Sequence, residues 1–339
     1  MKTRFLFFAF ALLVTIAIGF SAGSSQRSRS TIPAKVQPSL LAALPQSDAV
    51  ALVQVRRLLD EAVPKILADN ATKLAEVNAE LDKFKTRTGV DPRACDQVAL
   101  GMRYTYPSAS VTKVDTVAIA RGKFDTSAIV AAGRAASAGK YREEKYQDRT
   151  IYVFVLDQSL RAFGVMNMKV HELALTALDA NTLALGKPED VRRAIDASKG
   201  RASVNQELIA LATRDPNAVI GFGGNVTPKL IQSLKLSNEA IVQDISSIRQ
   251  VYGSVGTTEK DVEMFLAART INADSAKNLG TTLEGLKQLG AFLVGRMPAP
   301  KGSVARTALD NLKITTDGNE LQIRTAVAQA DLGPLLGGK

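Results

Sequence analysis

Tryptophan is absent from this sequence of 339 residues, which also has a single cysteine and a single histidine. Cys95 cannot form an intramolecular disulfide, so the folded parts must be large enough to be held by their own apolar cores. We expect Cys95 to be an inert buried thiol. His171 lies far from Cys95 in the chain, and one residue of each type cannot supply an ordinary transition-metal site. The sequence therefore predicts no metal and no cofactor.

Aromatic residues are scarce outside the N-terminal segment, because five of the twelve Phe lie within it. Few stacking platforms remain for bases or sugars, so neither a nucleic-acid partner nor a carbohydrate is expected. The formal net charge is +10, and the basic residues are spread along the chain. Diffuse basicity favours anionic surfaces such as lipid head groups. The alternative is an ordinary solvated surface of mixed charge.

The N-terminus has the pattern of an export signal. Lys2 and Arg4 precede the apolar run Phe5–Phe20, and small residues suited to cleavage follow it up to position 23. Residues 1–23 are therefore predicted to be a signal peptide or, if uncleaved, a short anchor. Residues 24–44 are rich in Ser, Arg, Pro and Gln and are predicted to form a flexible linker. We expect an exported protein, periplasmic or extracellular.

A strand, a short turn and a helix are predicted at Val114–Ala136, and a diverged copy of this pattern is predicted at Val262–Leu289. In each copy an Ala-Arg pair ends the strand. Asp125 in the first copy and Asp274 in the second have the chemistry of a helix N-cap, because a carboxylate accepts hydrogen bonds from the free N–H groups of the first turn.

Other landmarks recur in the same order, which indicates a tandem duplication. Repeat 1 would occupy residues 45–200. Repeat 2 would occupy 201–336, beginning with a connecting helix that a capping box at Ser203–Gln206 introduces. The paired landmarks are two strand starts, two hairpin turns and two helices: 48–50 with 217–219, 179–181 with 317–319, and 190–195 with 331–336.

Strand and helix patterns alternate through both repeats. The helix expected over 70–88 places Leu74, Val77, Leu81 and Phe84 on one face. Further segments are strands at 48–55, 98–106 and 149–156 and helices at 56–67 and 188–198. The predicted fold class is α+β, with two similar tandem subdomains. Each is expected to be a mainly antiparallel sheet with helices packed on one face.

Arg121 and Arg269 occupy matching positions at the ends of the two repeated strands. A guanidinium at each end predicts a pair of anion contacts at one edge of the folded body. The alternative is structural: each arginine would bond the nearby Asp cap or the turn carbonyls of its own copy. These two arginines are the candidate binding residues of the sequence.

Three short stretches resemble catalytic or phosphate-binding motifs but do not match them fully. Ser137 and Lys140 match S-x-x-K, but this serine closes a helix, whereas in penicillin-binding enzymes it opens one. The stretch Gly133–Lys140 has five residues between its glycines, whereas a P-loop has four. Gly221–Asn225 lies between a strand and a helix, as a phosphate loop does, but its third glycine is replaced; the alternative is a tight strand–helix turn. No catalytic residue is predicted, and we expect no enzyme.

Three motifs carry a resemblance to a known group of proteins. They are L-P-x-S-D-A-V-A-L-V-x-V at Leu44–Val55, G-V-D-P at Gly89–Pro92 before a strand, and S-V-N-Q-E-L at Ser203–Leu208. With the export signal, they make the chain resemble a group of bacterial exported proteins that carry a duplicated domain of unknown function. The resemblance covers residues 44–336 and implies no active site.

These observations predict a non-enzymatic binding or interaction module of the cell envelope. Its partner would be an envelope protein or an anionic lipid surface. The alternative is a carrier of a lipid or another apolar ligand in a cavity between sheet and helices. An exposed apolar patch, or a concave surface between the halves, would favour the first hypothesis.

Overall fold

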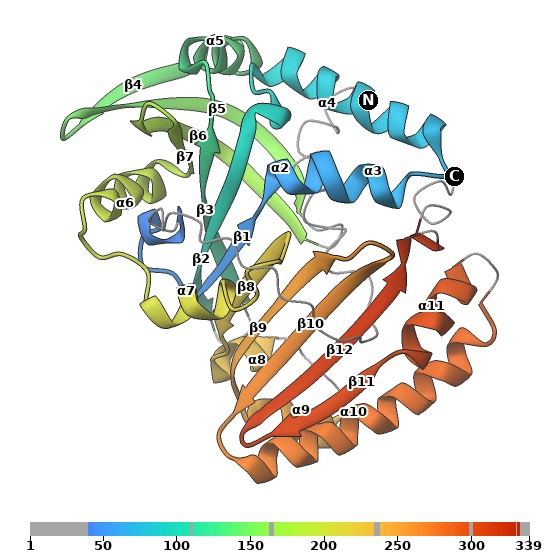
Figure 1. The fold of residues 1–339 in the computed structure, drawn as a ribbon. Coiled ribbons are helices and arrows are strands. Elements are labelled where there is room, and N and C mark those ends of the chain that lie inside the picture. The colour runs from blue at the N-terminus through green and yellow to red at the C-terminus, as the bar shows by residue number, and fades with distance from the viewer. Residues whose placement is uncertain are drawn as a thin grey trace.

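One antiparallel sheet of twelve strands dominates the computed structural model, which describes residues 40–108, 111–162, 166–233, 238–297, 301–329 and 331–332 (Figure 1). The strand order is β11-β12-β10-β9-β8-β1-β2-β3-β7-β6-β5-β4. The predicted α+β class is confirmed. The strands are β1 (Ala49–Val53), β2 (Cys95–Ser108), β3 (Val111–Gly122), β4 (Tyr141–Tyr146), β5 (Arg149–Ala162), β6 (Met166–Asp179), β7 (Thr182–Gly186), β8 (Ile220–Asn225), β9 (Ile248–Thr257), β10 (Asp261–Thr270), β11 (Lys313–Asp317) and β12 (Glu320–Ala328).

Helices connect these strands and cover parts of both sheet faces (Figure 1). They are α2 (Val55–Arg57), α3 (Val63–Ile66), α4 (Ala71–Thr88), α5 (Thr126–Ala136), α6 (Pro188–Ser198), α7 (Gln206–Ala212), α8 (Pro228–Ser233), α9 (Glu239–Ser246), α10 (Ala273–Val294) and α11 (Lys301–Asp310), with the short turns η1 (Leu40–Ala43), η2 (Leu58–Ala62) and η3 (Pro92–Ala94). The predicted signal, residues 1–23, lies outside the described residues, as do 333–336 of the last predicted helix.

The two halves join edge to edge through β1 and β8. Counting outward from this junction, one side runs β1, β2, β3, β7, β6 and the other β8, β9, β10, β12, β11. Each series ends in a hairpin, and only the first half continues into β5 and β4. Leu52 lies opposite Gly221 in the β1–β8 ladder. The halves therefore share one continuous sheet, and this order is compatible with the duplication that the sequence predicts.

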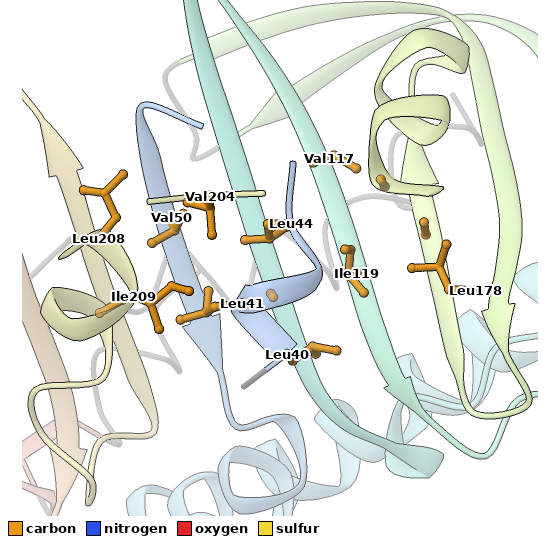
Figure 2. Packing of buried hydrophobic residues seen from close by; sticks show 14 of the residues in the cluster. Leu40, Leu41, Leu44, Val50, Val117, Ile119, Leu178, Val204, Leu208 and Ile209 are labelled. Atoms are coloured by element: carbon orange, nitrogen blue, oxygen red, sulfur yellow. The ribbon is translucent and has the colours of Figure 1, made fainter. Parts of the chain in front are cut away.

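The largest core cluster lies on one face of the sheet, under η1, α6 and α7 (Figure 2). Alternate side chains of the first-half strands, such as Val50 and Ile119, point into it. Their neighbours Ala51 and Ala118 point to the opposite face, where α2 and α3 close a second cluster. Helices thus cover both faces of the first half, and the expectation of a single covered face is wrong there, because its central strands are apolar on both sides.

In the second half, α9, α10 and α11 cover one face of the sheet. The opposite face is covered by α7 over β8 and β9 only. Beyond them it is polar, since Glu320, Gln322 and Arg324 of β12 alternate with the inward-facing Leu321 and Ile323. Apart from the connecting helix, this half has the one-sided cover that the sequence predicts.

The N-cap residues of three helices can be compared with the predicted ones: one prediction is confirmed and two are wrong. Asp125 caps α5 by accepting from the Ala128 N–H at 3.0 Å, as predicted. In the second copy the cap is Asn272, which accepts from the Ser275 N–H at 2.9 Å, and Asp274 sits inside the first turn. Asn205 caps α7, in place of Ser203. In both wrong cases an asparagine stands directly before the first helical residue and reaches the free N–H groups first.

The end of the predicted linker, residues 24–44, belongs to the core. Leu40, Leu41 and Leu44 are fully buried in the cluster under α6 and α7. The Leu44 carbonyl also accepts from the Val204 N–H at 3.0 Å, which ties this segment to the chain before α7. The three leucines at the end of this polar stretch pack into the core, so the folded body includes the chain from Leu40 onward.

Gly221–Asn225 is neither a phosphate loop nor a turn, because it forms the strand β8 itself. A Cβ on Gly221 would lie 2.0 Å from the Ala212 carbonyl oxygen, and one on Gly223 would lie 2.8 Å from the Leu211 Cβ. Glycine at these positions lets the backbone of α7 lie directly on the sheet at the junction of the two halves.

Gly221→Ala should lower the free energy of unfolding by about 1–3 kcal/mol, because α7 must move off the sheet to make room. Gly285→Ala is the matched control: this helical glycine has no neighbour within 4 Å of an added Cβ. It should raise the free energy of unfolding by about 0.5–1 kcal/mol. Denaturant unfolding of the three proteins checks both signs, and equal effects would contradict the packing role of Gly221.

Candidate functional site

Arg121 and Arg269 lie on opposite sides of the sheet along the direction of its strands. Each is the penultimate residue of its strand. Five antiparallel pairings separate β3 from β10, an odd number, so these two strands run in opposite directions. The prediction that the two arginines form a pair of contacts at one edge is therefore wrong. The cause is the antiparallel junction between halves, which the local sequence pattern does not encode.

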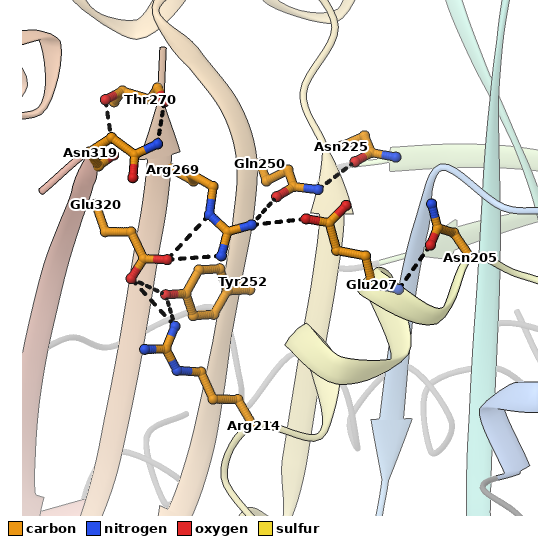
Figure 3. A network of polar contacts seen from close by, with 10 residues as sticks. All are labelled: Asn205, Glu207, Arg214, Asn225, Gln250, Tyr252, Arg269, Thr270, Asn319 and Glu320. Carbon is orange, nitrogen blue, oxygen red and sulfur yellow. Dashed lines mark hydrogen bonds and ion pairs between the residues drawn. The ribbon is translucent and has the colours of Figure 1, made fainter. Parts of the chain in front are cut away.

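Arg269 is surrounded by its own protein partners (Figure 3). Its guanidinium donates to Glu320 Oε1 at 3.0 Å, to Glu207 Oε1 at 2.9 Å and to Gln250 Oε1 at 2.7 Å. Arg121 is half-buried and forms no ion pair within the described chain. Neither alternative from the sequence describes Arg269, which bonds side chains of α7, β9 and β12 rather than a cap or turn of its own copy. That either arginine contacts an anion stays a prediction.

Glu320 is the centre of this network. The Tyr252 hydroxyl donates to Glu320 Oε2 at 2.8 Å and accepts from Arg214, which lies just after α7 (Figure 3). Burial raises the pKa of Tyr252 to about 12, and the neighbouring Glu320 adds to the effect. Burial alone would raise the pKa of Glu320, but hydrogen bonds from Tyr252 and Arg269 hold it below its ordinary value. The network fastens both ends of α7 to the second half, and its role is structural.

The remaining sequence candidates lie apart from one another. Cys95 is buried in the second cluster, and desolvation raises the pKa of its thiol to about 12, as expected of an inert thiol. His171 is exposed on β6. Ser137 follows the end of α5 and donates to the Arg134 carbonyl at 3.1 Å. Among the described residues no group of three or more His, Cys, Asp or Glu side chains could hold a metal ion.

A strip of exposed apolar side chains runs along the C-terminal half of α10. Leu286, Leu289, Phe292 and Leu293 are 40–59% exposed, and Met297 after the helix is 44% exposed. Positions 286, 289 and 293 follow the i, i+3, i+7 spacing of one helix face. We call these five residues the α10 strip. Single exposed apolar residues are ordinary, but contiguous ones mark an interaction surface.

Cationic side chains accompany the α10 strip. The Arg296 guanidinium lies 4.4 Å from the centre of the Phe292 ring, at the end of the strip. Arg306 on α11 is exposed. Residues 281–310 contain four basic residues and two acidic ones. The strip is therefore apolar with one cation, Arg296, at its end, in a stretch of the chain that is basic overall. No helix in the described part of the chain has the length and hydropathy needed to cross a membrane.

Two hollows lie on the surface of the described residues. An open groove of about 390 Å3 lies between α10 and β11, lined by Lys277, Gly280, Thr281, Glu284, Ile314, Thr315 and Thr316. A smaller one of about 110 Å3 includes Arg103, Arg193 and Asp196 in its lining. Most of the residues that line each hollow are polar or charged, whereas a site for an apolar ligand is enclosed mainly by hydrophobic and aromatic side chains. The carrier hypothesis stays a prediction, which neither of these two hollows supports.

Sequence reasoning missed the α10 strip. It treated the second strand–helix copy only as a match to the first and stopped at Leu289. The signal was present in the helix pattern: Leu279, Leu283, Leu286, Leu289 and Leu293 recur at steps of three and four, so one apolar stripe runs along α10 almost to its end. Only Leu279 and Leu283 pack against the sheet, so the rest of the stripe predicts a second contact.

The Glu320 network predicts a pH-dependent stability. Because the folded protein lowers the pKa of Glu320, its contribution is complete above the unfolded pKa, about 4.3, and is lost as pH falls through the folded value. Glu320→Gln should cost about 1–3 kcal/mol at pH 7 and much less near pH 3. Denaturant unfolding at both pH values measures this, with the exposed Glu259→Gln as control. A cost of Glu320→Gln that does not change with pH would contradict the assigned charge.

No protein-family model matches the sequence, and no curated protein matches it. The solved structures that resemble it include crystal forms III and I of TP0453. They share 10% and 8% sequence identity with this chain and have TM-scores of 0.44 and 0.43. The first alignment covers 90% of this chain and 100% of the other, and the second covers 89% and 97%.

Proposed function

We propose that this protein is a non-enzymatic binding module of the bacterial cell envelope that docks reversibly on an anionic lipid surface through the α10 strip. The observation that carries the proposal is the strip itself, with three side chains more than half exposed: Leu289, Phe292 and Leu293. An apolar helix face with cations beside it is the composition of helices that lie in the membrane interface.

Charge decides between a lipid surface and an apolar protein partner. The chain has a net charge of +10, and the stretch around the strip is itself basic by two charges, four minus two. Arg296 covers Phe292, so its cation would enter the head-group region as the ring enters the apolar layer. A protein partner would need a matching acidic rim, whereas anionic lipid supplies negative charge everywhere along the helix.

The energies are those of a reversible contact. Burying a large apolar side chain that is already half covered contributes about 1 kcal/mol, so the five residues of the strip contribute about 5 kcal/mol. Each cation near an anionic surface adds about 1 kcal/mol. Such a sum supports peripheral binding and falls far short of permanent insertion.

The proposal also includes export and duplication. The N-terminal signal would bring the chain to the envelope, and the linker would let the folded body reach a membrane if the signal stays attached. The matching strand order on both sides of the β1–β8 junction supports a duplicated unit. In that scheme α10 is the second-copy counterpart of α5, lengthened from 11 to 22 residues, and the added length carries the strip.

Vesicle binding tests the proposed function. The purified protein is sedimented with vesicles of phosphatidylcholine alone or mixed equally with phosphatidylglycerol. Wild-type protein should prefer the anionic vesicles, and added salt should weaken that preference. Leu289→Asp combined with Phe292→Asp should lower the partition coefficient at least about thirtyfold, because two apolar contacts are replaced by repelled charges.

Val111→Asp is the matched control, since Val111 is 49% exposed at the start of β3, outside α10. It should bind anionic vesicles like the wild type. Equal binding by the strip variant and the wild type would refute the assigned surface. Crosslinking in cells to one envelope protein, dependent on the strip and without vesicle binding, would replace the lipid surface by a protein partner.

A further inference from the structure

The two edges of the sheet have different chemistry. Within the described chain β4 pairs with β5 alone and β11 pairs with β12 alone, so each leaves a row of backbone N–H and C=O groups on its outer side. β4 reads YREEKY and β11 reads KITTD. An exposed edge invites another strand, and natural proteins block it with unfavourable charges unless pairing is useful.

We propose that β11 is a self-association edge: two copies of this chain pair their β11 strands antiparallel about a twofold axis at Thr315. In that register Lys313 lies opposite Asp317 of the second copy, and Asp317 opposite its Lys313. Ile314 and Thr316 form the pairs between. Opposite charges directly across a ladder stabilise the pairing. A twofold axis makes each favourable contact occur twice.

Lys313 and Asp317 are available for this pairing. Both are exposed, and neither forms an ion pair within the described chain. Their own cross-strand neighbours on β12 are of like charge: Lys313 lies opposite Arg324 and Asp317 opposite Glu320. An arriving strand with the reverse order of charges relieves both juxtapositions. Lys313 and Asp317 therefore destabilise the monomer slightly and stabilise the dimer.

A second pair of opposite charges would meet across the same axis, between the two copies of α10. Gly280 lies close to Thr316, and the Lys287 ammonium bonds the Leu312 carbonyl, so α10 runs antiparallel to β11. The residues of α10 level with Thr315 are thus near Thr281. Lys277 and Glu284 flank that point on the groove side. The twofold axis would bring Lys277 of one copy toward Glu284 of the other, with small residues at the closest approach.

The opposite edge excludes the same arrangement. Antiparallel self-pairing of β4 would place Arg142 opposite Lys145 and Glu143 opposite Glu144, so both interior pairs are of like charge. Arg142 is also engaged by Glu172 and by Glu144, the latter at 3.0 Å. β4 is therefore a blocked edge and β11 is the one suited to a second copy.

The α10 strip stays outside the proposed contact. The groove side of α10 carries positions 277, 281 and 284, whereas the strip carries 286, 289 and 293, on a different stripe of the helix. A short edge pairing with a helix contact is at the small end of specific interfaces, so a readily reversible dimer is expected.

Disulfide trapping tests the axis directly. Residues opposite in an antiparallel ladder have Cα atoms about 4.5–5.5 Å apart, within the range of a disulfide. Thr315→Cys should therefore give a covalent dimer under mild oxidation, through a residue exposed in the monomer, while the native Cys95 stays buried. Lys145→Cys on β4 is the matched control for random collision and should crosslink at least about tenfold more slowly.

Charge reversal tests the register by sedimentation equilibrium. Lys313→Glu or Asp317→Lys should each raise the dissociation constant at least about tenfold, while the double variant should return it to within about threefold of wild type. Each single variant gains an opposite charge facing Arg324 or Glu320, so folding is preserved. Wild-type protein that is monomeric at the highest attainable concentration, equal crosslinking at positions 315 and 145, or a double variant without rescue overturns the proposal.

Discussion

The backbone pairing of β1 with β8 is the interaction on which the rest of the structure depends. It joins two halves that would otherwise each present a free edge, and it extends over five residues on each strand. The pairing needs glycine. A Cβ on Gly224 would lie 2.8 Å from the Cβ of Ala49 in the opposite strand. Gly221 and Gly223 leave the space in which α7 lies.

The connecting helix closes this junction from one side. Leu208, Ile209 and Leu211 of α7 enter the largest core cluster together with Val50 of β1. Glu207 at its start reaches Arg269, and Arg214 after its end reaches Tyr252 and Glu320. Apolar packing therefore fixes the helix on the sheet, while the polar network fixes its two ends. The contacts of Arg269 with Glu207, Gln250 and Glu320 are part of this fastening.

Local sequence patterns predicted the elements well, because periodicity and capping are local physics. The helix over 188–198 and the hairpin turns at 179–181 and 317–319 lie where expected. Pro64 lies within the helix that the sequence predicts over 56–67, and the chain there opens into the π-type turn η2 just before it. The missing N–H of proline accounts for this change.

Long-range geometry could not be predicted from the same patterns. The opposite placement of Arg121 and Arg269 depends on the direction of β8 relative to β1, which no single segment encodes. The wrong caps at Asp274 and Ser203 arose because two acceptors compete within a few residues and only the chain path selects one. The sequence did not predict β4, because its run of four charged residues resembles a loop, although charged residues suit a protected edge.

The two proposed surfaces would reinforce each other through geometry. A twofold axis at Thr315 runs normal to the sheet, so both copies of α10 would lie on the same face of one continuous sheet. Two strips would then face one membrane. Binding of the second strip becomes intramolecular once the first is bound, so two contacts of a few kcal/mol combine into an avidity about 100-fold or more above either. Weak strips and a weak dimer are together sufficient for stable but reversible docking.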